Sequence, residues 1–519
     1  MAHALHAVAD SSWLDRPRHV PALAYALISV ALLGLWVGFY LLNPFGFDRA
    51  MRDTWHHVAV LRELMAAPLA PTNPHIPTDE PSRYFTPVAL LAALVGKALG
   101  VTPYTLFGYM GAVSCIGLVV GCWVFARRYF QSAWAPLALL LVFLFAWGAQ
   151  VSHVGFHNYA VLLSSAAYPS QIALVLGLFS WALALRLLEA DTNQLFHLAL
   201  LSVLAATILL VHQLSGFVAL LGTGSFILFH RRSNLRRKSA LLAALAIGCL
   251  LTLAWPYFPI LDVLFSVGDD RWKSPDAKIN QLSTVALLTA PTLAGVLGFI
   301  TPERKVRWEL AAPALFLSLS FVVLTLTDSP IGHRLPPAVI LYNQLGLVWL
   351  FLSLLRAWRP SPVRIAMVAA VCLLITASAI GAGRSRMQDL RSRDLNGSMI
   401  AMAGSLAKHI PPNSVSFATE SIVFPLQSTG RRVVSIPRPE PAAPSLGQRQ
   451  LATDRFFNAD TGQDERRRLL DRWGATHVVI VPDNLPSATV RALRALGPSR
   501  AFSHGAEIIT VSSPADERQ

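Results

Sequence analysis

The sequence predicts a mainly α-helical, polytopic membrane protein that ends in a small α/β domain. Of its 519 residues, 54% are apolar and only 14% are charged, a balance that ordinary soluble domains do not show. Apolar runs of about 17–25 residues, long enough to cross a bilayer as helices, recur as far as residue 381. Beyond that residue the composition becomes that of a soluble protein. We therefore expect a membrane domain over 1–381 and a soluble domain over 382–519.

Eleven of the apolar runs are predicted to span the membrane. The first is long, comes late and has no small-residue cleavage site after it, so we interpret it as a retained anchor. The predicted spans are 22–42, 103–126, 133–148, 169–188, 195–211, 214–229, 239–258, 283–300, 308–326, 336–355 and 365–381.

The distribution of Lys and Arg predicts the orientation. Short loops rich in these residues stay on the cytoplasmic side. If the N-terminus is inside, the short inner loops hold the run HRRSNLRRK at 230–238 and the pair Arg127 and Arg128. The outer loops are longer and carry fewer basic residues. We expect a cytoplasmic N-terminus and an extracytoplasmic C-terminal domain, in the plasma (inner) membrane of a bacterium.

A long first outer loop, 43–102, is expected to contain a helix at the membrane surface. The segment YFTPVALLAALVGKALG, 84–100, is short for a membrane crossing. Counting it as a crossing would move every later loop to the opposite side of the membrane. A helix lying at the surface buries one apolar side there. Pro87 suits the first turn of such a helix, where a missing N–H costs nothing.

The C-terminal domain shows regular α/β alternation. Helices are predicted over 396–410, 446–457, 463–473 and 486–496, and strands over 414–418, 431–436, 476–481 and 507–512. Gly474 is expected to cap the helix that precedes it. The domain has no Gly-rich phosphate loop and no Gly-x-Ser-x-Gly elbow, so its motifs indicate no activity of their own.

Candidate functional residues concentrate in the loops assigned to the outer face. The stretch NPFGFDRAMRDTWHHV, directly after the first span, holds Asp48, Asp53, His56 and His57. Ionisable side chains beside lipid are costly, so they indicate a functional site. His212 and Arg334, at the outer ends of later spans, are further candidates.

Each candidate also has a purely structural interpretation. Asp53 can cap a helix, and His56 and His57 can be interfacial residues with satisfied hydrogen bonds. Arg334 can anchor a helix at the interface, and His212 can be a polar residue between helices.

Composition argues against several other functions. The net charge of +14 comes without aromatic residues interleaved in a basic stripe, so nucleic-acid binding is not expected. The four cysteines all fall inside predicted spans, which gives the C-terminal domain neither a disulfide framework nor a thiolate metal site. The sequence identifies no metal site and no cofactor.

Several segments together resemble the GT-C glycosyltransferases, polytopic enzymes that use polyprenyl-phosphate sugar donors. The resembling segments are RDTWHHVAVLRELMAAPLAPTNPH (52–75), YFTPVALLAALVGKALG (84–100), HQLSGF (212–217), GHRLPPAVILYN (332–343) and ERRRLLDRWGATHVVIV (465–481). In that family an acid of the first loop lies near the acceptor nucleophile. The resemblance places this acid at Asp53, with Asp48 as the rival, although the paired Asp-Glu of many relatives is replaced here by Asp53-Thr-Trp-His-His.

The resemblance implies transfer of a sugar from a polyprenyl-phosphate donor to a glycan, lipid or protein acceptor on the extracytoplasmic face. Asp53 would accept the proton of the acceptor hydroxyl, and cations would hold the donor phosphate. If Asp53 begins a helix, His57 shares its face and can orient the carboxylate, contact the phosphate or help bind a divalent cation. Arg334 and His212 are candidate phosphate partners. The alternative is a transporter or flippase of lipid-linked saccharides, which predicts internal repeats and broken helices near the bilayer midplane.

Overall fold

The structure is a computed structural model, which describes most of the chain. The described residues are 19–42, 52–147, 157–159, 162, 165–189, 194–265, 292–300, 305–327, 329, 331–356, 397–412, 414–437, 440–502 and 505–511. They form two compact units. The helix unit comprises Met1–Gly46, Gly108–Ala254 and Gly268–Arg391, and the mixed unit comprises Phe47–Phe107, Trp255–Val267 and Ser392–Gln519.

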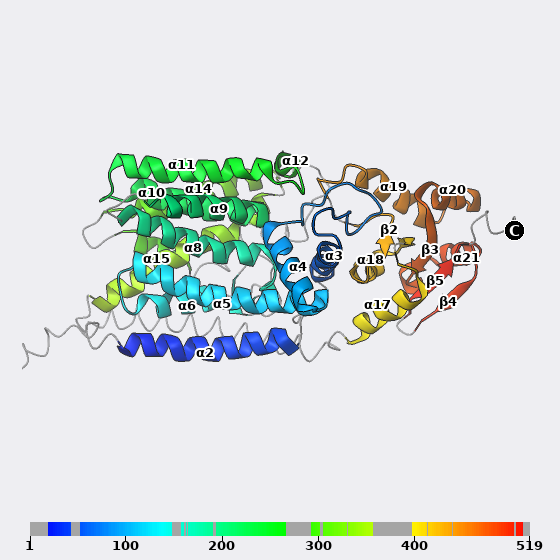
Figure 1. The fold of residues 1–519 in the computed structure, drawn as a ribbon, viewed down its shortest axis with the longest axis horizontal. Coiled ribbons are helices and arrows are strands. Elements are labelled where there is room, and N and C mark those ends of the chain that lie inside the picture. Colours follow the sequence, from blue (N-terminus) through cyan, green and yellow to red (C-terminus); the bar gives the residue numbers. More distant parts are fainter. Residues whose placement is uncertain are drawn as a thin grey trace, which may run out of the picture. The chain divides into compact units, whose positions relative to one another are not determined.

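The helix unit is a bundle of helices that lie side by side (Figure 1). Its helices are α2 (His19–Leu42), α5 (Pro103–Tyr129, which begins in the mixed unit), α6 (Ala135–Phe145), α8 (Pro169–Glu189), α9 (Leu195–Val211), α10 (Gln213–Phe229), α11 (Leu235–Leu251), α14 (Trp308–Leu326) and α15 (Pro336–Arg356). Three short 3₁₀ segments accompany them: η2 (Thr252–Ala254), η6 (Ala294–Phe299) and η7 (Gly332–Arg334).

The predicted spans agree closely with these helices. The bounds of α9 and α14 coincide with the predicted spans 195–211 and 308–326. Among the described residues, six helices are long and apolar enough to cross a membrane, and the mainly α, polytopic fold class is confirmed. Of the predicted span 283–300 only 292–300 is described, partly as η6, and the span 365–381 lies outside the described residues.

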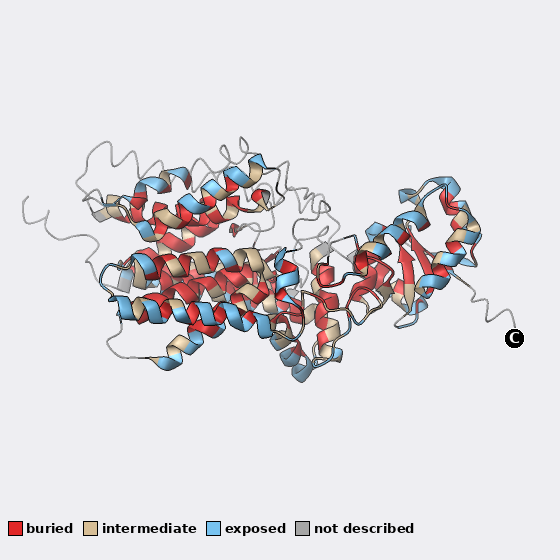
Figure 2. Ribbon diagram, turned by 90° about the horizontal axis from the view of Figure 1, so that it is seen from above, coloured by how far each residue is buried: buried red, intermediate tan, exposed pale blue. Residues whose placement is uncertain are grey.

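The outward faces of the bundle are apolar, as a lipid environment requires. Exposed large hydrophobic residues follow the length of several helices (Figure 2). Examples are Leu23, Leu27 and Val30 on α2, Val113, Ile116 and Val120 on α5, and Leu315, Leu319 and Val323 on α14. A soluble monomer rarely exposes so extended an apolar surface.

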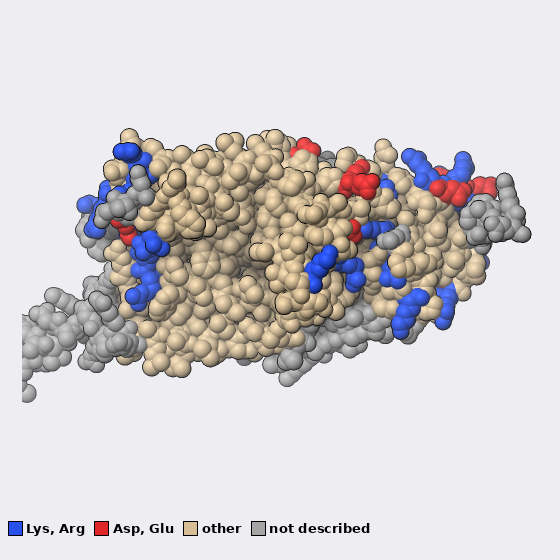
Figure 3. All heavy atoms as spheres, viewed as in Figure 1, with Lys and Arg blue, Asp and Glu red and all other residues tan. Residues whose placement is uncertain are grey.

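Basic side chains gather at one end of the helix unit (Figure 3). Arg128, at the end of α5, forms a 2.6 Å ion pair with Glu189 at the end of α8. Arg237, in the first turn of α11, donates a 3.1 Å hydrogen bond to the carbonyl oxygen of Leu188. The C-terminal ends of α5 and α8 and the first turn of α11 therefore lie together, as the basic-residue distribution predicts.

The mixed unit contains a five-stranded sheet with the strand order β2-β1-β3-β5-β4. Strands β2 (Arg432–Val433), β1 (Val415–Ala418) and β3 (Ala475–Ile480) are parallel. Strands β5 (Glu507–Thr510) and β4 (Ser499–Ala501) complete the sheet in antiparallel fashion. Apolar residues of the sheet form one core with helices α19 (Leu446–Phe457), α20 (Gln463–Trp473) and α21 (Ser487–Arg494), in which Phe417 stacks on Phe456 at 4.1 Å.

The predicted C-terminal elements are largely present. The bounds of α19 and α20 match their predictions, α17 (Gly397–His409) fills 396–410, and Gly474 caps α20 with φ 60°. Two elements escaped prediction, the helix α18 (Glu420–Ser428) and the strand β4. The predicted strand 431–436 shortens to β2, although the N–H of Val434 still donates a 2.9 Å hydrogen bond to the carbonyl oxygen of Ser416 in β1. The short 3₁₀ helix η8 (Pro482–Asn484) follows β3.

Two helices of the first loop complete the mixed unit, with the short α12 (Ile260–Phe265). Helix α4 (Pro87–Leu99) begins at Thr86, whose hydroxyl accepts the N–H of Ala89, and it ends at Gly100 with φ 64°. Pro87 occupies its first turn, as predicted. Helix α3 (Arg52–Ala66) packs against α4 and α18. The mixed unit therefore contains both the first loop and the C-terminal domain. The predicted domain boundary at residue 381 lies outside the described residues.

Candidate functional site

Helix α3 positions three of the predicted site residues. Asp53 lies in its first turn and is half-buried, and an acidic residue there suits the positive end of the helix dipole. His57 follows one turn later on the same face, as expected from the sequence if Asp53 begins a helix. His56 faces the protein interior and is 1% exposed.

The rings of the two histidines belong to a cluster of aromatic side chains. His56 stacks on His75 with 3.7 Å between ring centroids and meets the ring of Tyr84 edge-on at 4.0 Å. His57 lies 5.7 Å from the Tyr84 ring and stacks against Phe107 at 6.0 Å. Tyr84 is therefore the residue that both histidines contact.

Arg83 connects this cluster to the C-terminal domain. Its Nη2 donates a 2.9 Å hydrogen bond to the Tyr84 hydroxyl, and its guanidinium lies 5.0 Å from the Tyr84 ring. Its backbone N–H donates to Glu440 at 3.2 Å. Burial opposes the charged form of Arg83, but the neighbouring Tyr84, Glu440 and Asp53 together raise the pKa of its guanidinium.

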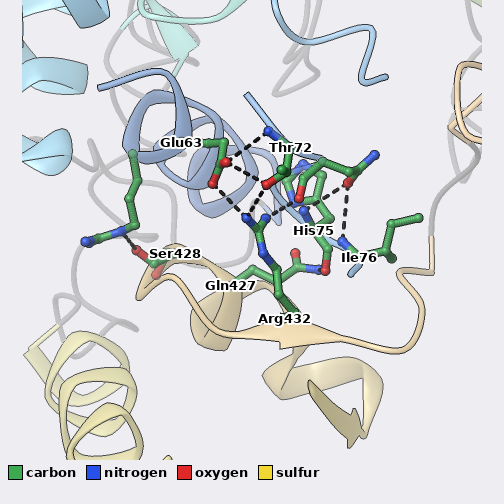
Figure 4. A network of polar contacts seen from close by, with 9 residues as sticks. Glu63, Thr72, His75, Ile76, Gln427, Ser428 and Arg432 are labelled. Atoms are coloured by element: carbon green, nitrogen blue, oxygen red, sulfur yellow. Dashed lines mark hydrogen bonds and ion pairs between the residues drawn. The ribbon is translucent and has the colours of Figure 1, made fainter. Parts of the chain in front are cut away.

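Arg432 of β2 joins α3 to the segment that follows it (Figure 4). Its Nη2 is 2.7 Å from a carboxylate oxygen of Glu63 and 2.9 Å from the hydroxyl of Thr72, while Nη1 donates to the carbonyl oxygen of Asn73. Glu63 also accepts hydrogen bonds from the backbone and the hydroxyl of Thr72. One guanidinium thus ties the end of α3 and the first residues of the next segment to the sheet.

The backbone of His75 docks on the same edge of the sheet. Its carbonyl oxygen accepts from the Gln427 side chain at 3.1 Å and from the Val433 N–H at 3.2 Å. A loop that covers an edge strand in this way provides partners for the otherwise unpaired backbone groups of the strand. The His75 ring is fully buried, and its pKa is lowered well below 6.5 by burial and by the positive charge of Arg432.

Further contacts hold the rest of the loop. Glu80 accepts hydrogen bonds from the backbone and the hydroxyl of Ser445, and Tyr257 donates a 2.7 Å hydrogen bond to the carbonyl oxygen of Pro68. The Trp255 indole N–H donates to the carbonyl oxygen of Phe85 at 2.9 Å. Two stretches of chain that are distant in sequence, at residues 255–257 and at Ser445, thereby help to fix the path of residues 67–86.

His212 and Arg334 belong to the helix unit. His212 separates α9 from α10, and its Nδ1 accepts the N–H of Ser215 at 3.2 Å as the N-cap of α10. Arg334 is half-buried in η7, directly before α15. The roles predicted for both at a donor phosphate stay predictions. Asp48, the rival of Asp53, lies outside the described residues.

The part of the chain that the structure describes contains no group of three His, Cys, Asp or Glu side chains placed to hold a metal ion. Help in binding a divalent cation, one of three roles considered for His57, stays untested.

Sequence reasoning missed Arg83, Tyr84, Glu440 and Arg432. Arg83 directly precedes the resembling segment 84–100 and Tyr84 is its first residue, and this position was a usable signal. Glu440 and Arg432 lie more than 350 residues from their partners in the first loop, and no local pattern marks them.

Comparison with known proteins places the fold. No protein-family model and no curated protein matches the sequence. Among solved structures, the arabinofuranosyltransferase AftD from Mycobacteria matches with a TM-score of 0.60 and 16% identity, over 96% of this chain and 40% of that one. ArnT from Cupriavidus metallidurans matches with a TM-score of 0.55 and 14% identity, over 94% of this chain and 98% of that one.

The chain has the GT-C fold. The oligosaccharyltransferase of Archaeoglobus fulgidus shares it with a TM-score of 0.54 and 11% identity, over 90% of this chain and 70% of that one. This chain therefore spans 40% of the AftD chain but nearly the whole length of ArnT. The resemblance inferred from sequence is confirmed at the level of the GT-C fold.

Replacing Arg432 by Ala is expected to loosen residues 72–76 from the sheet. The Arg432 and Glu63 side chains are only 12% and 17% exposed, and removing a charged hydrogen-bond donor from such a pair costs about 2 kcal/mol. Hydrogen exchange followed by mass spectrometry should show roughly thirtyfold faster exchange in a peptide covering this segment.

The matched control for this experiment is Arg455→Ala. Arg455 pairs with Glu465 in the same domain, but the two side chains are 53% and 34% exposed, and such surface pairs contribute little. Unchanged exchange of residues 72–76 in Arg432→Ala would contradict the role assigned to Arg432.

His75 is expected to make the protein less stable in mild acid. Its folded-state pKa lies below the ordinary 6.5, so below pH 6.5 the unfolded chain takes up a proton that the folded protein refuses. The free energy of unfolding then decreases by up to about 1.4 kcal/mol for each unit by which the pH is lowered. Between pH 7.5 and roughly pH 5, the melting temperature should fall less steeply in His75→Phe, which keeps the stacked ring, than in the wild type. The exposed His409→Phe should follow the wild type, and equal slopes in all three proteins would contradict the prediction.

Proposed function

We propose that the protein is a membrane glycosyltransferase. It transfers a sugar from a polyprenyl-phosphate donor to an acceptor on the extracytoplasmic face of a bacterial plasma membrane. The observation that carries the proposal is the placement of Asp53. It lies in the first turn of a largely buried helix within a GT-C fold, with His57 one turn later on the same face.

The chemistry needs few groups from the protein. A bond forms between the acceptor oxygen and the anomeric carbon of the sugar, while the bond from that carbon to the phosphate oxygen breaks. The leaving polyprenyl phosphate takes the electron pair, and the Asp53 carboxylate takes the hydroxyl proton. Arg334 and His212 are proposed to bind the phosphate, where guanidinium and imidazole donors offset the developing charge.

Two fold relatives support the choice of donor. ArnT from Cupriavidus metallidurans has been solved with bound undecaprenyl phosphate, and it shares the fold with a TM-score of 0.54 and 13% identity over 95% of this chain and 98% of that one. AftD is described as an arabinofuranosyltransferase. The apolar surface of the helix bundle suits contact with the lipid bilayer, in which such a donor is dissolved.

Replacing Asp53 by Asn is expected to reduce sugar transfer by about 10²–10⁴-fold, the usual contribution of a general base. The measurement is transfer from synthetic polyprenyl-phosphate sugars by purified protein. Asp48→Asn is compared directly, because Asp48 is the rival. Asp79→Asn serves as the control, since Asp79 is an exposed acid of the same loop. Undiminished transfer in both Asp53→Asn and Asp48→Asn would rule out the carboxylate mechanism.

The proposed orientation is tested with reporter fusions. A reporter enzyme that is active only outside the cytoplasm is expected to be active when fused after residue 381 and inactive when fused within 231–238, where basic residues are dense. The reverse pattern would overturn the assignment of the C-terminal domain to the extracytoplasmic side.

A further inference from the structure

Two arginines of the mixed unit meet at the C-terminal end of α18. Arg62, from α3, donates a 2.9 Å hydrogen bond from Nε to the carbonyl oxygen of Ser428 (Figure 4). Its Cδ lies 3.2 Å from the place that a Cβ on Gly430 would take. Arg431 donates from Nη1 to the carbonyl oxygen of Thr429 at 2.7 Å. Because Ser428 and Thr429 are consecutive residues, their carbonyl groups bring both guanidinium groups to the same turn of the chain.

This turn carries more positive charge than the capping of a helix requires. The carbonyl groups at the end of a helix amount to about half an elementary negative charge. Arg431 uses every side-chain nitrogen on carbonyl oxygens, since its Nε also bonds to Ile410 at 2.9 Å and its Nη2 bonds to Ala407. In its hydrogen bonds to carbonyl groups of the described residues, Arg62 uses only Nε. Its two Nη groups are therefore not needed for capping.

Neither arginine forms an ion pair with a carboxylate of the described residues. The adjacent Arg432 differs, because it pairs with Glu63 at 2.7 Å. Burial and the nearby positive charge of Arg62 both lower the pKa of Arg431. The two side chains are half-buried, so a ligand can reach them while water screens their repulsion incompletely. An anion that binds both guanidinium groups would relieve this repulsion.

The same turn contacts the end of a membrane helix. The hydroxyl groups of Tyr104 and Ser428 are 2.8 Å apart, and Tyr104 lies in the first turn of α5, which is long and apolar enough to cross a membrane. Tyrosine is enriched where such helices pass through the headgroup layer of a bilayer. The arginine pair is therefore expected at the level of the lipid headgroups, where phosphate is the characteristic anion. The planar guanidinium group matches the geometry of phosphate oxygens.

We propose that Arg62 and Arg431 form a binding site for the phosphate group of a membrane lipid. The phosphate accepts hydrogen bonds from both guanidinium groups, and its negative charge offsets their repulsion. A lipid bound there ties α3 and the turn after α18 to the bilayer. Phospholipids and polyprenyl phosphates both carry such a group, so the site does not depend on the proposed reaction.

The test measures lipid binding by the purified full-length protein in an uncharged detergent. The probes are phosphatidylglycerol, undecaprenyl phosphate and a diacylglycerol, which lacks the phosphate. Arg62→Gln is expected to raise the Kd of at least one phosphate lipid by about tenfold or more, because a charged hydrogen-bond donor is lost. Arg455→Gln serves as the control, since Arg455 is an exposed arginine of the same unit that pairs with Glu465, and it should bind as the wild type does.

A second measurement separates lipid binding from protein stability. The rise in melting temperature caused by a fixed concentration of lipid is compared with the lipid-free form of the same variant, so that an intrinsic loss of stability cancels. Arg62→Lys, which keeps the charge but loses the planar group, should retain part of the rise. Arg62→Gln should lose most of it.

The lipid that loses affinity identifies the occupant of the site. A loss for phosphatidylglycerol alone assigns the site to a phospholipid, a loss for undecaprenyl phosphate alone assigns it to a polyprenyl lipid, and a loss for both supports a general lipid-phosphate site. Wild-type affinity of both Arg62→Gln and Arg431→Gln for the two phosphate lipids would overturn the proposal. An equal loss for the diacylglycerol would also overturn it, because the phosphate would then not be the group that is recognised.

Discussion

The mixed unit depends on polar bonds between the first loop and the C-terminal domain. Residues 67–86 contain no helix or strand, so their backbone groups need partners from elsewhere. Arg432 and Gln427 supply them for the carbonyl groups of Asn73 and His75, Glu440 does the same for the N–H of Arg83, and Ser445 holds the Glu80 side chain. Since each bond joins segments separated by more than 350 residues, the loop takes its course only when the C-terminal domain is folded.

This dependence explains how α3 is buried despite its polar sequence. The helix carries RDTWHHVAVLREL, yet Thr54, Trp55 and His56 are all buried. Helix α4 packs against α3 from the first loop, and α18 packs against it from the C-terminal domain. The loop covers His56 by stacking the His75 ring on it. The half-buried Asp53 at the start of this helix is therefore held by a rigid support, which a base in a transfer reaction requires.

The same arrangement gives the C-terminal domain a defined part in the proposed chemistry. Its sheet and helices carry none of the phosphate or nucleophile motifs that would give it an activity. What it contributes is charge at two points of the first loop, Arg432 at Glu63 and Glu440 at Arg83.

The sequence by itself determined the apolar spans, the basic end of the bundle and most elements of the C-terminal domain. These features are local, since hydropathy, Lys and Arg near span ends, and a capping residue such as Gly474 act within a few residues. The position of Asp53 at a helix start was predictable for the same reason. Only the tertiary structure decided that the Arg83 backbone N–H bonds to Glu440, and that Arg432 holds Glu63 and Thr72. Helix α18 with its internal Pro425 and the exposed strand β4 likewise depend on packing, because their own residues carry no clear periodic signal.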